Sequence, residues 1–272
     1  MKYAVMSDVH ANPKALKAAL SDARSRGCRK FIFLGDITGY GYDVKEALRI
    51  IRENFDVVLM GNHDSACLGM EPWFEVQTNK NYRVDLMHRE ILSEDEKEWL
   101  RSRPYEFSED DAFFVHGDCT NPRAWNYILG SEAVAVNLLY CPKRLLFCGH
   151  SHFAAVWEMV GGPAGGGKMK CGSKLLKYFS TPAKQHADTR SFKVVDNGRY
   201  IVNVGSVGYP RNDLCSTYVI YDSSARRVTY RRMPVDLFAY AAELAARHIS
   251  LPLWLRGALD RSAAEDKPRG RN

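Results

Sequence analysis

The sequence has no long hydrophobic run, no closely spaced cysteine pair and little net charge. No apolar run approaches the roughly 18 residues that cross a bilayer, so no membrane partner is expected. The 7 cysteines are odd in number and no two have CxxC spacing, which indicates reduced thiols in a cytoplasm. Acidic Asp8 falls where the apolar stretch of a signal peptide would continue, so the first residues are interpreted as a strand rather than an export signal.

The composition is that of an ordinary globular protein. Lysine and arginine number 38 against 32 for aspartate and glutamate, a mild excess of +6 over 272 residues. This excess is compatible with an anionic substrate and does not favour nucleic-acid binding. Hydrophobic residues at 46% and charged residues at 26% exclude a mostly disordered chain, a collagen-like chain and a disulfide-dense miniprotein. No pattern in the sequence indicates an oligomeric state.

Five strand-length apolar runs punctuate the first part of the chain, and each is followed by glycine, acidic or histidine residues. They are Tyr3–Met6, Lys30–Leu34, Val57–Met60, Ala112–Val115 and Leu145–Cys148. Helical patterns fill the first two gaps, over residues 13–26 and 43–53, with apolar side chains on one face. This alternation of strand and helix predicts βαβ units in an α/β fold.

The second half of the chain is less regular. Three alternating runs are predicted as strands of a second sheet, namely Tyr200–Val204, Thr217–Tyr221 and Val228–Arg232, and residues 236–248 as a terminal helix. Residues 68–104 and 161–196 are interpreted as insertions, the first with a helix that starts at Ser93 and the second as a glycine-rich loop or hairpin tip. One domain over residues 1–260 and a disordered tail over 261–272 are expected. Four basic residues are expected on a solvated strand face: Arg226, Arg227, Arg231 and Arg232.

Polar side chains gather where the predicted strands end. The blocks are Asp8-Val9-His10, Gly35-Asp36, Gly61-Asn62-His63-Asp64, His116-Gly117-Asp118 and Gly149-His150-Ser151-His152. Ligands of open α/β sheets bind beyond the carboxyl ends of the strands, which is where these blocks fall. In an extended segment, residues i and i+2 point the same way, so Asp8 and His10 are expected to present two donors together. The same reasoning applies to His150 and His152.

Seven of these side chains are candidate metal ligands: Asp8, His10, Asp36, Asn62, His116, His150 and His152. Mixed oxygen and nitrogen donors suit Mn, Fe, Co, Ni or Zn, and the lack of cysteine in these blocks argues against a structural zinc–thiolate site. Seven ligands are too many for one tetrahedral site. They suit two divalent metal ions bridged by a carboxylate, with open positions for water and substrate.

The ordered motifs resemble the calcineurin-like metallophosphoesterase superfamily. Within it, residues 35–41 (GDITGYG) and 203–212 (NVGSVGYPRN) are similar to the compact bacterial branch of phosphodiesterases and diadenosine-tetraphosphatase-like proteins. The resemblance implies a four-layer α/β/β/α sandwich of two mixed sheets flanked by helices.

The resemblance also implies a role for each residue of the site. Metal one would be held by Asp8, His10, Asp36 and His152, and metal two by Asp36, Asn62, His116 and His150, so that Asp36 is the bridge. His63 resembles the family's catalytic histidine, which donates a proton to the leaving oxygen or stabilises its charge. Arg211 is expected to bind substrate phosphate. Manganese is the favoured metal.

One departure from a sister branch bears on the substrate. The protein Ser/Thr phosphatases carry a motif like Gly-Asp-x-Val-Asp-Arg-Gly, and here Gly39 and Tyr40 stand at the positions of the second Asp and the Arg. A partner carboxylate for His63 and a phosphate-binding arginine are therefore expected to be missing, and protein phosphatase activity is not expected.

Several other residues have two interpretations. Asp64 supports either the site or a helix start, Asp118 either a ligand or a turn, and Asn12 either the site or a plain N-cap. Six aromatic residues either wall a nucleoside pocket or pack ordinarily, namely Tyr40, Tyr42, Trp73, Phe74, Trp125 and Tyr209. Three histidines outside the motifs are interpreted as surface or core residues: His88, His186 and His248.

The sequence therefore predicts a dinuclear metal-dependent phosphoesterase in the cytoplasm. The predicted activity is that of a phosphodiesterase, which hydrolyses a nucleotide or other small phosphoester by in-line attack of a metal-bridging hydroxide. The alternative is a scaffold that keeps the fold and binds metal and proteins without turnover. The physiological substrate and the native metal stay open.

Overall fold

The first part of the chain forms the predicted βαβ units. The structure is a computed structural model that describes residues 1–71, 82–160, 189–211, 215–234, 237–249 and 256. Its first elements are β1 (Lys2–Met6), α1 (Pro13–Ser25), β2 (Lys30–Phe33), α2 (Val44–Asn54) and β3 (Val57–Val58). The strands β1, β2 and β3 are parallel, and the helices α1 and α2 provide the crossover connections that parallel strands need.

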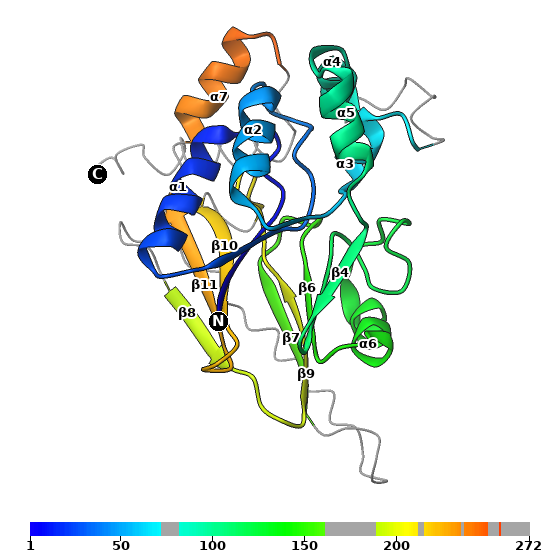
Figure 1. Ribbon diagram of the computed structural model, residues 1–272, viewed down its shortest axis with the longest axis vertical. Helices are drawn as coiled ribbons and strands as arrows, with labels where there is room; N and C mark the ends of the chain where they lie inside the picture. Colours follow the sequence, from blue (N-terminus) through cyan, green and yellow to red (C-terminus); the bar gives the residue numbers. More distant parts are fainter. Residues whose placement is uncertain (72–81, 161–188, 212–214, 235–236, 250–255, 257–272) are drawn as a thin grey trace, which may run out of the picture.

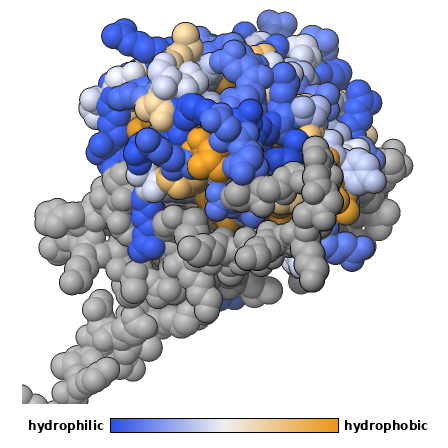
Figure 2. All heavy atoms as spheres, turned by 90° about the horizontal axis from the view of Figure 1, so that it is seen from below, coloured by the Kyte–Doolittle hydropathy of each residue, from blue (hydrophilic) through white to orange (hydrophobic). Residues whose placement is uncertain are grey.

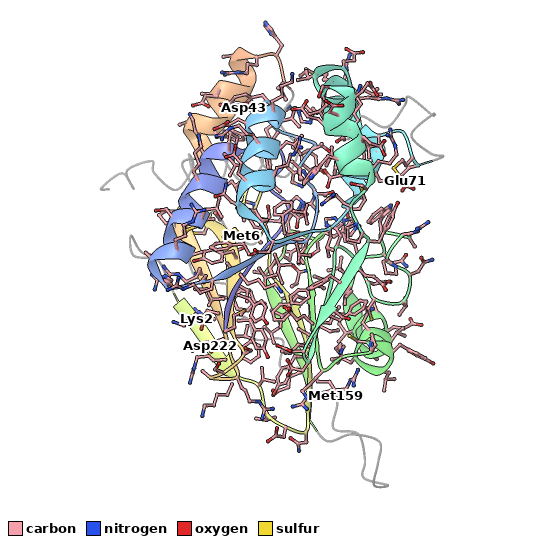
Figure 3. The ribbon with its side chains drawn as sticks, viewed as in Figure 1. Lys2, Met6, Asp43, Glu71, Met159 and Asp222 are labelled. Carbon is pink, nitrogen blue, oxygen red and sulfur yellow. The ribbon has the colours of Figure 1, made fainter. Side chains whose placement is uncertain are left out.

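Two mixed sheets follow from the strand pairing (Figure 1). The six-stranded sheet has the order β3-β2-β1-β10-β11-β8. In it β10 (Cys215–Asp222) pairs antiparallel with β1, β11 (Arg227–Pro234) antiparallel with β10, and β8 (Thr189–Lys193) antiparallel with β11. The five-stranded sheet has the order β4-β5-β6-β9-β7 and comprises β4 (Glu106–Glu109), β5 (Ala112–Val115), β6 (Leu145–Cys148), β7 (Ala155–Val160) and β9 (Gly198–Asn203). Figure 3 shows the register at one end of the first sheet, where Lys2 of β1 lies near its partner Asp222 of β10.

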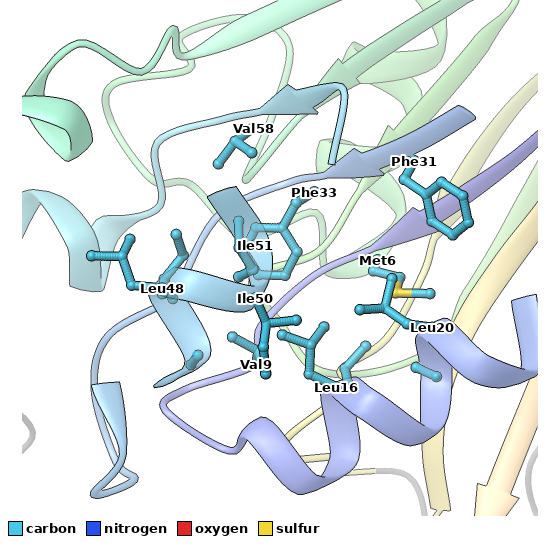
Figure 4. Close-up of a cluster of buried hydrophobic side chains, with 14 of the residues drawn as sticks. Met6, Val9, Leu16, Leu20, Phe31, Phe33, Leu48, Ile50, Ile51 and Val58 are labelled. Atoms are coloured by element: carbon cyan, nitrogen blue, oxygen red, sulfur yellow. The ribbon is translucent and has the colours of Figure 1, made fainter. Parts of the chain in front are cut away.

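The core is divided into layers by the alternation of side chains along each strand. Ala4 and Met6 of β1 face α1 and α2, where they pack with Leu16, Leu48 and Ile51 (Figure 4). The side chains between them point the other way, because successive residues of a strand face opposite sides. Tyr3 and Val5 accordingly pack between the two sheets, against residues of β5, β6, β9 and β10.

The second sheet repeats this arrangement on its own outer face. Phe114 of β5 lies between the sheets, whereas Phe113 and Val115 pack against α6 (Gly130–Tyr140) through Val134 and Leu138. The order of layers is therefore helices, sheet, sheet, helix, which confirms the predicted α/β/β/α sandwich. No helix in the described part of the chain is long and apolar enough to cross a bilayer. Figure 2 shows the molecule from below, and on the described part of this face most side chains are hydrophilic, with a few apolar ones among them.

The prediction that the three late strands share the second sheet is wrong. Only β9 joins it, parallel to β6, whereas β10 and β11 extend the first sheet from the free edge of β1. The open edge of β1 offers unpaired backbone groups that an antiparallel strand satisfies. Residues Cys215–Tyr221 of β10 are all buried, because helices cover one face and the other sheet covers the second.

The two predicted insertions contain regular structure. The first holds α4 (Arg83–Ile91) and α5 (Glu94–Arg101), and the predicted helix start is confirmed by a capping box between Ser93 and Glu96. The second overlaps β8, so the loop interpretation is wrong for residues 189–193, which pair with β11. The predicted terminal helix is confirmed as α7 (Leu237–Ala246). The predicted tail, residues 261–272, lies outside the described residues.

The basic face predicted on β11 is wrong for two of its four arginines. Arg231 and Arg232 are 3% and 1% exposed. Arg231 donates from Nε to Asp22 Oδ2 at 2.8 Å and from Nη2 to Asp22 Oδ1 at 3.0 Å, and the Tyr218 hydroxyl donates to the same carboxylate. A bidentate ion pair to α1 thus compensates the burial of this guanidinium.

Candidate metal centre

The predicted ligands all lie beyond the carboxyl ends of parallel strands from both sheets. Asp8 and His10 follow β1, Asp36 follows β2, and Asn62 begins α3 (Asn62–Cys67) after β3. His116 follows β5, and His150 and His152 follow β6. Figure 3 places Met6, at this end of β1, in the middle of the molecule.

These side chains converge into two buried groups that share one aspartate. Donor atoms of Asp8, His10, Asp36 and His152 lie within 4.8 Å of one another, and so do those of Asp36, His116 and His150. Asn62 lies beside the second group, because its Oδ1 is 3.0 Å from Nε2 of His116. All seven side chains predicted as ligands are therefore brought to one place.

The backbone that achieves this convergence is not extended, which corrects the geometric reasoning from the sequence. The residues Asp8, His10, Asp36, His150 and His152 have φ values of 57°, 46°, 64°, 62° and 61°, in the left-handed region. Non-glycine residues pay of the order of 1–3 kcal/mol each for sparsely populated backbone conformations, and such strain concentrates at functional sites. Asp8 and His10 nevertheless enter the same group, as predicted, whereas His150 and His152 do not point the same way and enter different groups.

Hydrogen bonds fix which nitrogen of three histidines faces the centre. Nδ1 donates to a backbone carbonyl in His10 (Thr38 O, 2.7 Å), His116 (Leu34 O, 3.1 Å) and His152 (Tyr209 O, 2.7 Å). A carbonyl oxygen can only accept, so each Nδ1 carries the proton. In the neutral ring, Nε2 then presents its lone pair, as is typical of metal-ligating histidines with an oriented outer partner.

The donor atoms are arranged to bind a cation rather than to form hydrogen bonds with one another. Nε2 of His10 and Nε2 of His152 are 3.1 Å apart although each carries a lone pair. Burial lowers the pKa of both rings, so both are neutral and neither can donate to the other. Asp8 Oδ1 and His150 Nε2 are also buried with no hydrogen-bond partner among the described residues. Facing lone pairs and orphaned buried acceptors are expected where divalent cations bind.

The electrostatics of the two aspartates favour their ionised forms. Burial raises the pKa of Asp8, but the neighbouring histidines, the cationic His116 among them, outweigh it and bring the value to about 2. Burial likewise opposes ionisation of Asp36, yet the cationic rings of His116 and His63 hold its pKa well below the usual range. Burial and the proximity of His116 lower the pKa of His150 to about 3, so this ring is a neutral donor. The two carboxylates and the imidazoles of His10, His150 and His152 are thus in the protonation states that bind metal. Burial lowers the pKa of His116 too, but the Asp36 carboxylate outweighs it and raises the pKa to about 9, so this ring must release a proton when a metal binds.

Asp64 supports the aspartate that the two groups share. Its Oδ1 accepts hydrogen bonds from the backbone N–H groups of Ile37 (2.9 Å) and Thr38 (3.0 Å). Its Oδ2 accepts from Asp36 (2.8 Å) and Gly61 (3.2 Å), the latter completing the start of α3. Burial and the neighbouring Asp36 carboxylate raise the pKa of Asp64 to about 7 against the effect of these backbone hydrogen bonds. Both interpretations left open by the sequence therefore apply to this residue.

His63 lies beside the two groups without joining either. Its Nδ1 is 2.9 Å from Oδ2 of Asp85, and both side chains are buried. Burial lowers the pKa of His63, but the carboxylates of Asp85 and Asp36 outweigh it and raise the pKa to about 9. The expectation that a partner carboxylate is missing is therefore wrong, because the carboxylate comes from α4 instead of from position 39.

Of the remaining candidates, Arg211 lies next to the site, whereas Asp118 and Asn12 have local structural roles. Arg211 lies next to residues 149–152, the GHSH turn: its backbone N–H donates to His152 O (3.2 Å) and its Nη1 to Ser151 O (3.5 Å). Asp118 accepts hydrogen bonds from Thr120 and Asn121 and is a turn residue. Asn12 caps α1 by accepting from the N–H of Ala15.

Of the aromatic candidates, only some approach the metal groups. The rings of Tyr40 and Tyr209 are 4.6 Å and 5.7 Å from that of His10, and Trp125 is 5.9 Å from His116. Tyr42 stacks on Tyr240 of α7. Trp73, Phe74 and His186 lie outside the described residues, and His248 is exposed.

Three supporting or flanking residues were not identified from the sequence. Asp85 carries no motif, although its place one turn after Tyr82 and one turn before His88 on α4 is a detectable pattern. Asn203 donates to Gly149 O (2.7 Å) and Ser151 Oγ (3.0 Å), which holds the GHSH turn. Tyr127 stacks on His150 with ring centroids 4.0 Å apart.

Comparison with known proteins agrees with the geometry. Residues 1–226 match the family described as the calcineurin-like phosphoesterase superfamily domain. An uncharacterized protein of Methanocaldococcus jannaschii, MJ0912, is 28% identical over 257 residues, which cover 93% of this chain and 94% of that protein. The crystal structure of a metallophosphoesterase from Sphaerobacter thermophilus is 30% identical with a TM-score of 0.72, covering 96% of this chain and 98% of that one.

A hypothetical protein from Pyrococcus horikoshii OT3, PH1004, shares the fold at 16% identity and a TM-score of 0.65, over 93% of this chain and 95% of its own. The two buried groups, the sandwich and the match over most of the chain all point the same way. The chain belongs to the calcineurin-like phosphoesterase superfamily.

Proposed function

We propose that the protein is a two-metal phosphodiesterase that hydrolyses a nucleotide or another small phosphoester. The observation that carries the proposal is the pair of buried donor groups that share Asp36. We expect one metal ion to be held by Asp8, His10, Asp36 and His152, and the other by Asp36, Asn62, His116 and His150. Family membership supports a hydrolase.

The donor set decides which cations suit the site. Carboxylate, amide and imidazole donors without thiolate favour borderline divalent ions such as Mn, Fe, Co, Ni or Zn, among which Mn is preferred here. Two such ions, when bound, activate water as a nucleophile near neutral pH and neutralise the phosphoryl oxygens. The remaining work falls to side chains of the chain itself.

His63 is the proposed proton donor. Asp85 occupies its Nδ1, which leaves Nε2 for the oxygen of the departing group. A positioned general acid typically contributes about 10²–10⁴ to the rate. Arg211, beside the turn that carries His152, is proposed to bind a non-bridging phosphate oxygen through its guanidinium fork.

The substrate is proposed to be small. Gly39 and Tyr40 replace the aspartate and arginine of the protein phosphatase motif, which supports a small phosphoester over a phosphoprotein. The motifs over residues 35–41 and 203–212 support the compact phosphodiesterase and diadenosine-tetraphosphatase-like branch, and the reduced-thiol interpretation supports a cytoplasmic location.

Hydrolysis of bis(4-nitrophenyl) phosphate with Mn²⁺ tests the proposal, with His63→Ala as the matched variant. The intact chain is expected to release nitrophenol and the variant to do so at least about 10²-fold more slowly. An intact chain that is inert with each of the five metals overturns the enzyme and favours the scaffold. Equal turnover by both proteins overturns the role of His63.

A further inference from the structure

One face of α4 is directed at His63 and at the loop that follows β2. Tyr82 at the N-cap, Asp85 and His88 are spaced three residues apart, and residues three or four apart lie on the same side of a helix. All three contact either His63 or residues 38–41, as the following distances show. This helix belongs to the segment interpreted from the sequence as an insertion.

Asp85 uses both of its carboxylate oxygens. Oδ2 lies 2.9 Å from Nδ1 of His63, and Oδ1 accepts a hydrogen bond from Thr38 Oγ1 at 3.2 Å. Asp85 is 0% exposed and His63 is 4% exposed, so water does not compete for either bond. Two bonds in fixed directions prevent the carboxylate from rotating away from the imidazole.

Aromatic rings restrict the imidazole further. The ring of Tyr40 is 4.7 Å and the ring of Tyr82 is 5.1 Å from the ring of His63. With the orientation of the ring set by these contacts and Nδ1 set by Asp85, only Nε2 is left to meet a substrate. The same arrangement selects the tautomer, because a carboxylate accepts the proton carried by Nδ1.

His88 holds the loop against which His63 packs. Its Nδ1 accepts the N–H of Gly39 at 3.2 Å, and its Nε2 donates to the carbonyl of Gly41 at 3.1 Å. Gly39 has a φ of +85°, and a Cβ there would lie 2.5 Å from Nδ1 of His63. Position 39 therefore has no room for a carboxylate side chain, so in this fold the partner of His63 comes from another element.

We propose that Asp85 is the positioning residue for His63, and that α4 is thereby part of the catalytic apparatus. This inference rests on the proposed function. In the reaction, water forms a bond to phosphorus and loses one proton, while the bond from phosphorus to the leaving oxygen breaks. His63 Nε2 gives its proton to that oxygen, and Asp85 stays ionised and keeps Nδ1–H in place.

Kinetics with two aryl phosphodiesters, whose phenols differ in pKa, separate a positioning role from a structural one. Asp85→Asn in the Mn²⁺-loaded full chain is expected to lower kcat about tenfold or more with little change in KM, and more for the poorer leaving group. In a His63→Ala background the same substitution is expected to change kcat by less than about twofold, because residues that act as a unit are not additive. The matched control is Glu90→Gln, which removes a charge from an exposed site on the same helix and is expected to behave as the unchanged protein.

A spectroscopic measurement needs no turnover. In the Zn²⁺-loaded protein with ¹⁵N-labelled histidine, His63 is expected to show a protected Nδ1 proton, which disappears in His63→Ala and in Asp85→Ala. Inertness of the unchanged protein toward every substrate would defeat the proposed function alone, and the Nδ1 proton would still decide on the pair. The inference on Asp85 is overturned if that proton survives Asp85→Ala, or if the effects of Asp85→Asn and His63→Ala multiply independently.

Discussion

Replacing Asp64 by asparagine perturbs the support of the shared aspartate without touching any predicted ligand. The carboxylate accepts four backbone N–H groups, two on each oxygen. An asparagine keeps one oxygen and presents an NH₂ group where the second oxygen was. Two buried N–H donors then lose their acceptor.

The magnitude follows from the cost of those two donors. An unsatisfied buried donor costs about 1–3 kcal/mol, which gives about 2–6 kcal/mol for the pair. Asparagine also removes a buried negative charge beside Asp36, which offsets part of this cost, so a loss near the lower end, about 2 kcal/mol, is expected. Groups that orient metal ligands change metal affinity about 10–100-fold when they are replaced, and the same weakening is expected for Mn²⁺ here.

Urea unfolding of the metal-free protein and calorimetric titration with Mn²⁺ measure the two effects separately. The control is Asp56→Asn, since Asp56 is an exposed carboxylate that accepts a single backbone N–H, from Phe31 at 2.8 Å. The control is expected to lose about 1 kcal/mol or less and to bind Mn²⁺ normally. Unchanged stability and unchanged Mn²⁺ affinity in Asp64→Asn would refute the reasoning about the support of Asp36.

Three further predictions concern the glycine turn, acid stability and the metals. Gly149→Ala places a Cβ against Ser7 Oγ and Asp8 Oδ2, so a loss of Mn²⁺ affinity is expected by calorimetry, and normal affinity would contradict the crowding. Burial opposes ionisation of Asp22, but its hydrogen bonds to Arg231 and Tyr218 hold its pKa below the usual range. The stability that the ionised carboxylate contributes is therefore present above pH about 4 and lost as the pH falls further. Asp22→Asn is expected to make the free energy of unfolding, measured with urea, less dependent on pH below about pH 4. A chelator is expected to lower the thermal midpoint, because each site at a metal concentration of 100 Kd adds about 2.7 kcal/mol to stability; a midpoint that ignores chelation in calorimetry would contradict a bound metal.

The elements with local signals were predictable from the sequence. Strand-length apolar runs and amphipathic patterns located β1, β2, α1 and α2, because their periodicity reflects which side is buried. The ordered polar blocks at strand ends brought the seven candidate ligands into view for the same reason, since parallel strands end at one edge of a sheet.

What depends on distant partners was not predictable. The pairing of β10 with β1 depends on an edge more than 200 residues away in the chain, and Arg231 is neutralised by Asp22 at a separation of 209 residues. Asp85 has no motif of its own and becomes meaningful only when α4 packs on the loop after β2. The expectation of extended backbone at the site failed because left-handed residues, which sequence periodicity does not reveal, direct His150 and His152 to different groups.

The number of metal ions bound per chain tests the central claim most directly. Elemental analysis after equilibration with Mn²⁺ and removal of free metal is expected to give two ions in the unchanged protein. One ion is expected in His116→Ala, since His116 belongs only to the second group, and almost none in Asp36→Ala, since Asp36 belongs to both. An unchanged protein that holds no metal, or an Asp36→Ala variant that retains both ions, would contradict a pair of cations sharing one aspartate.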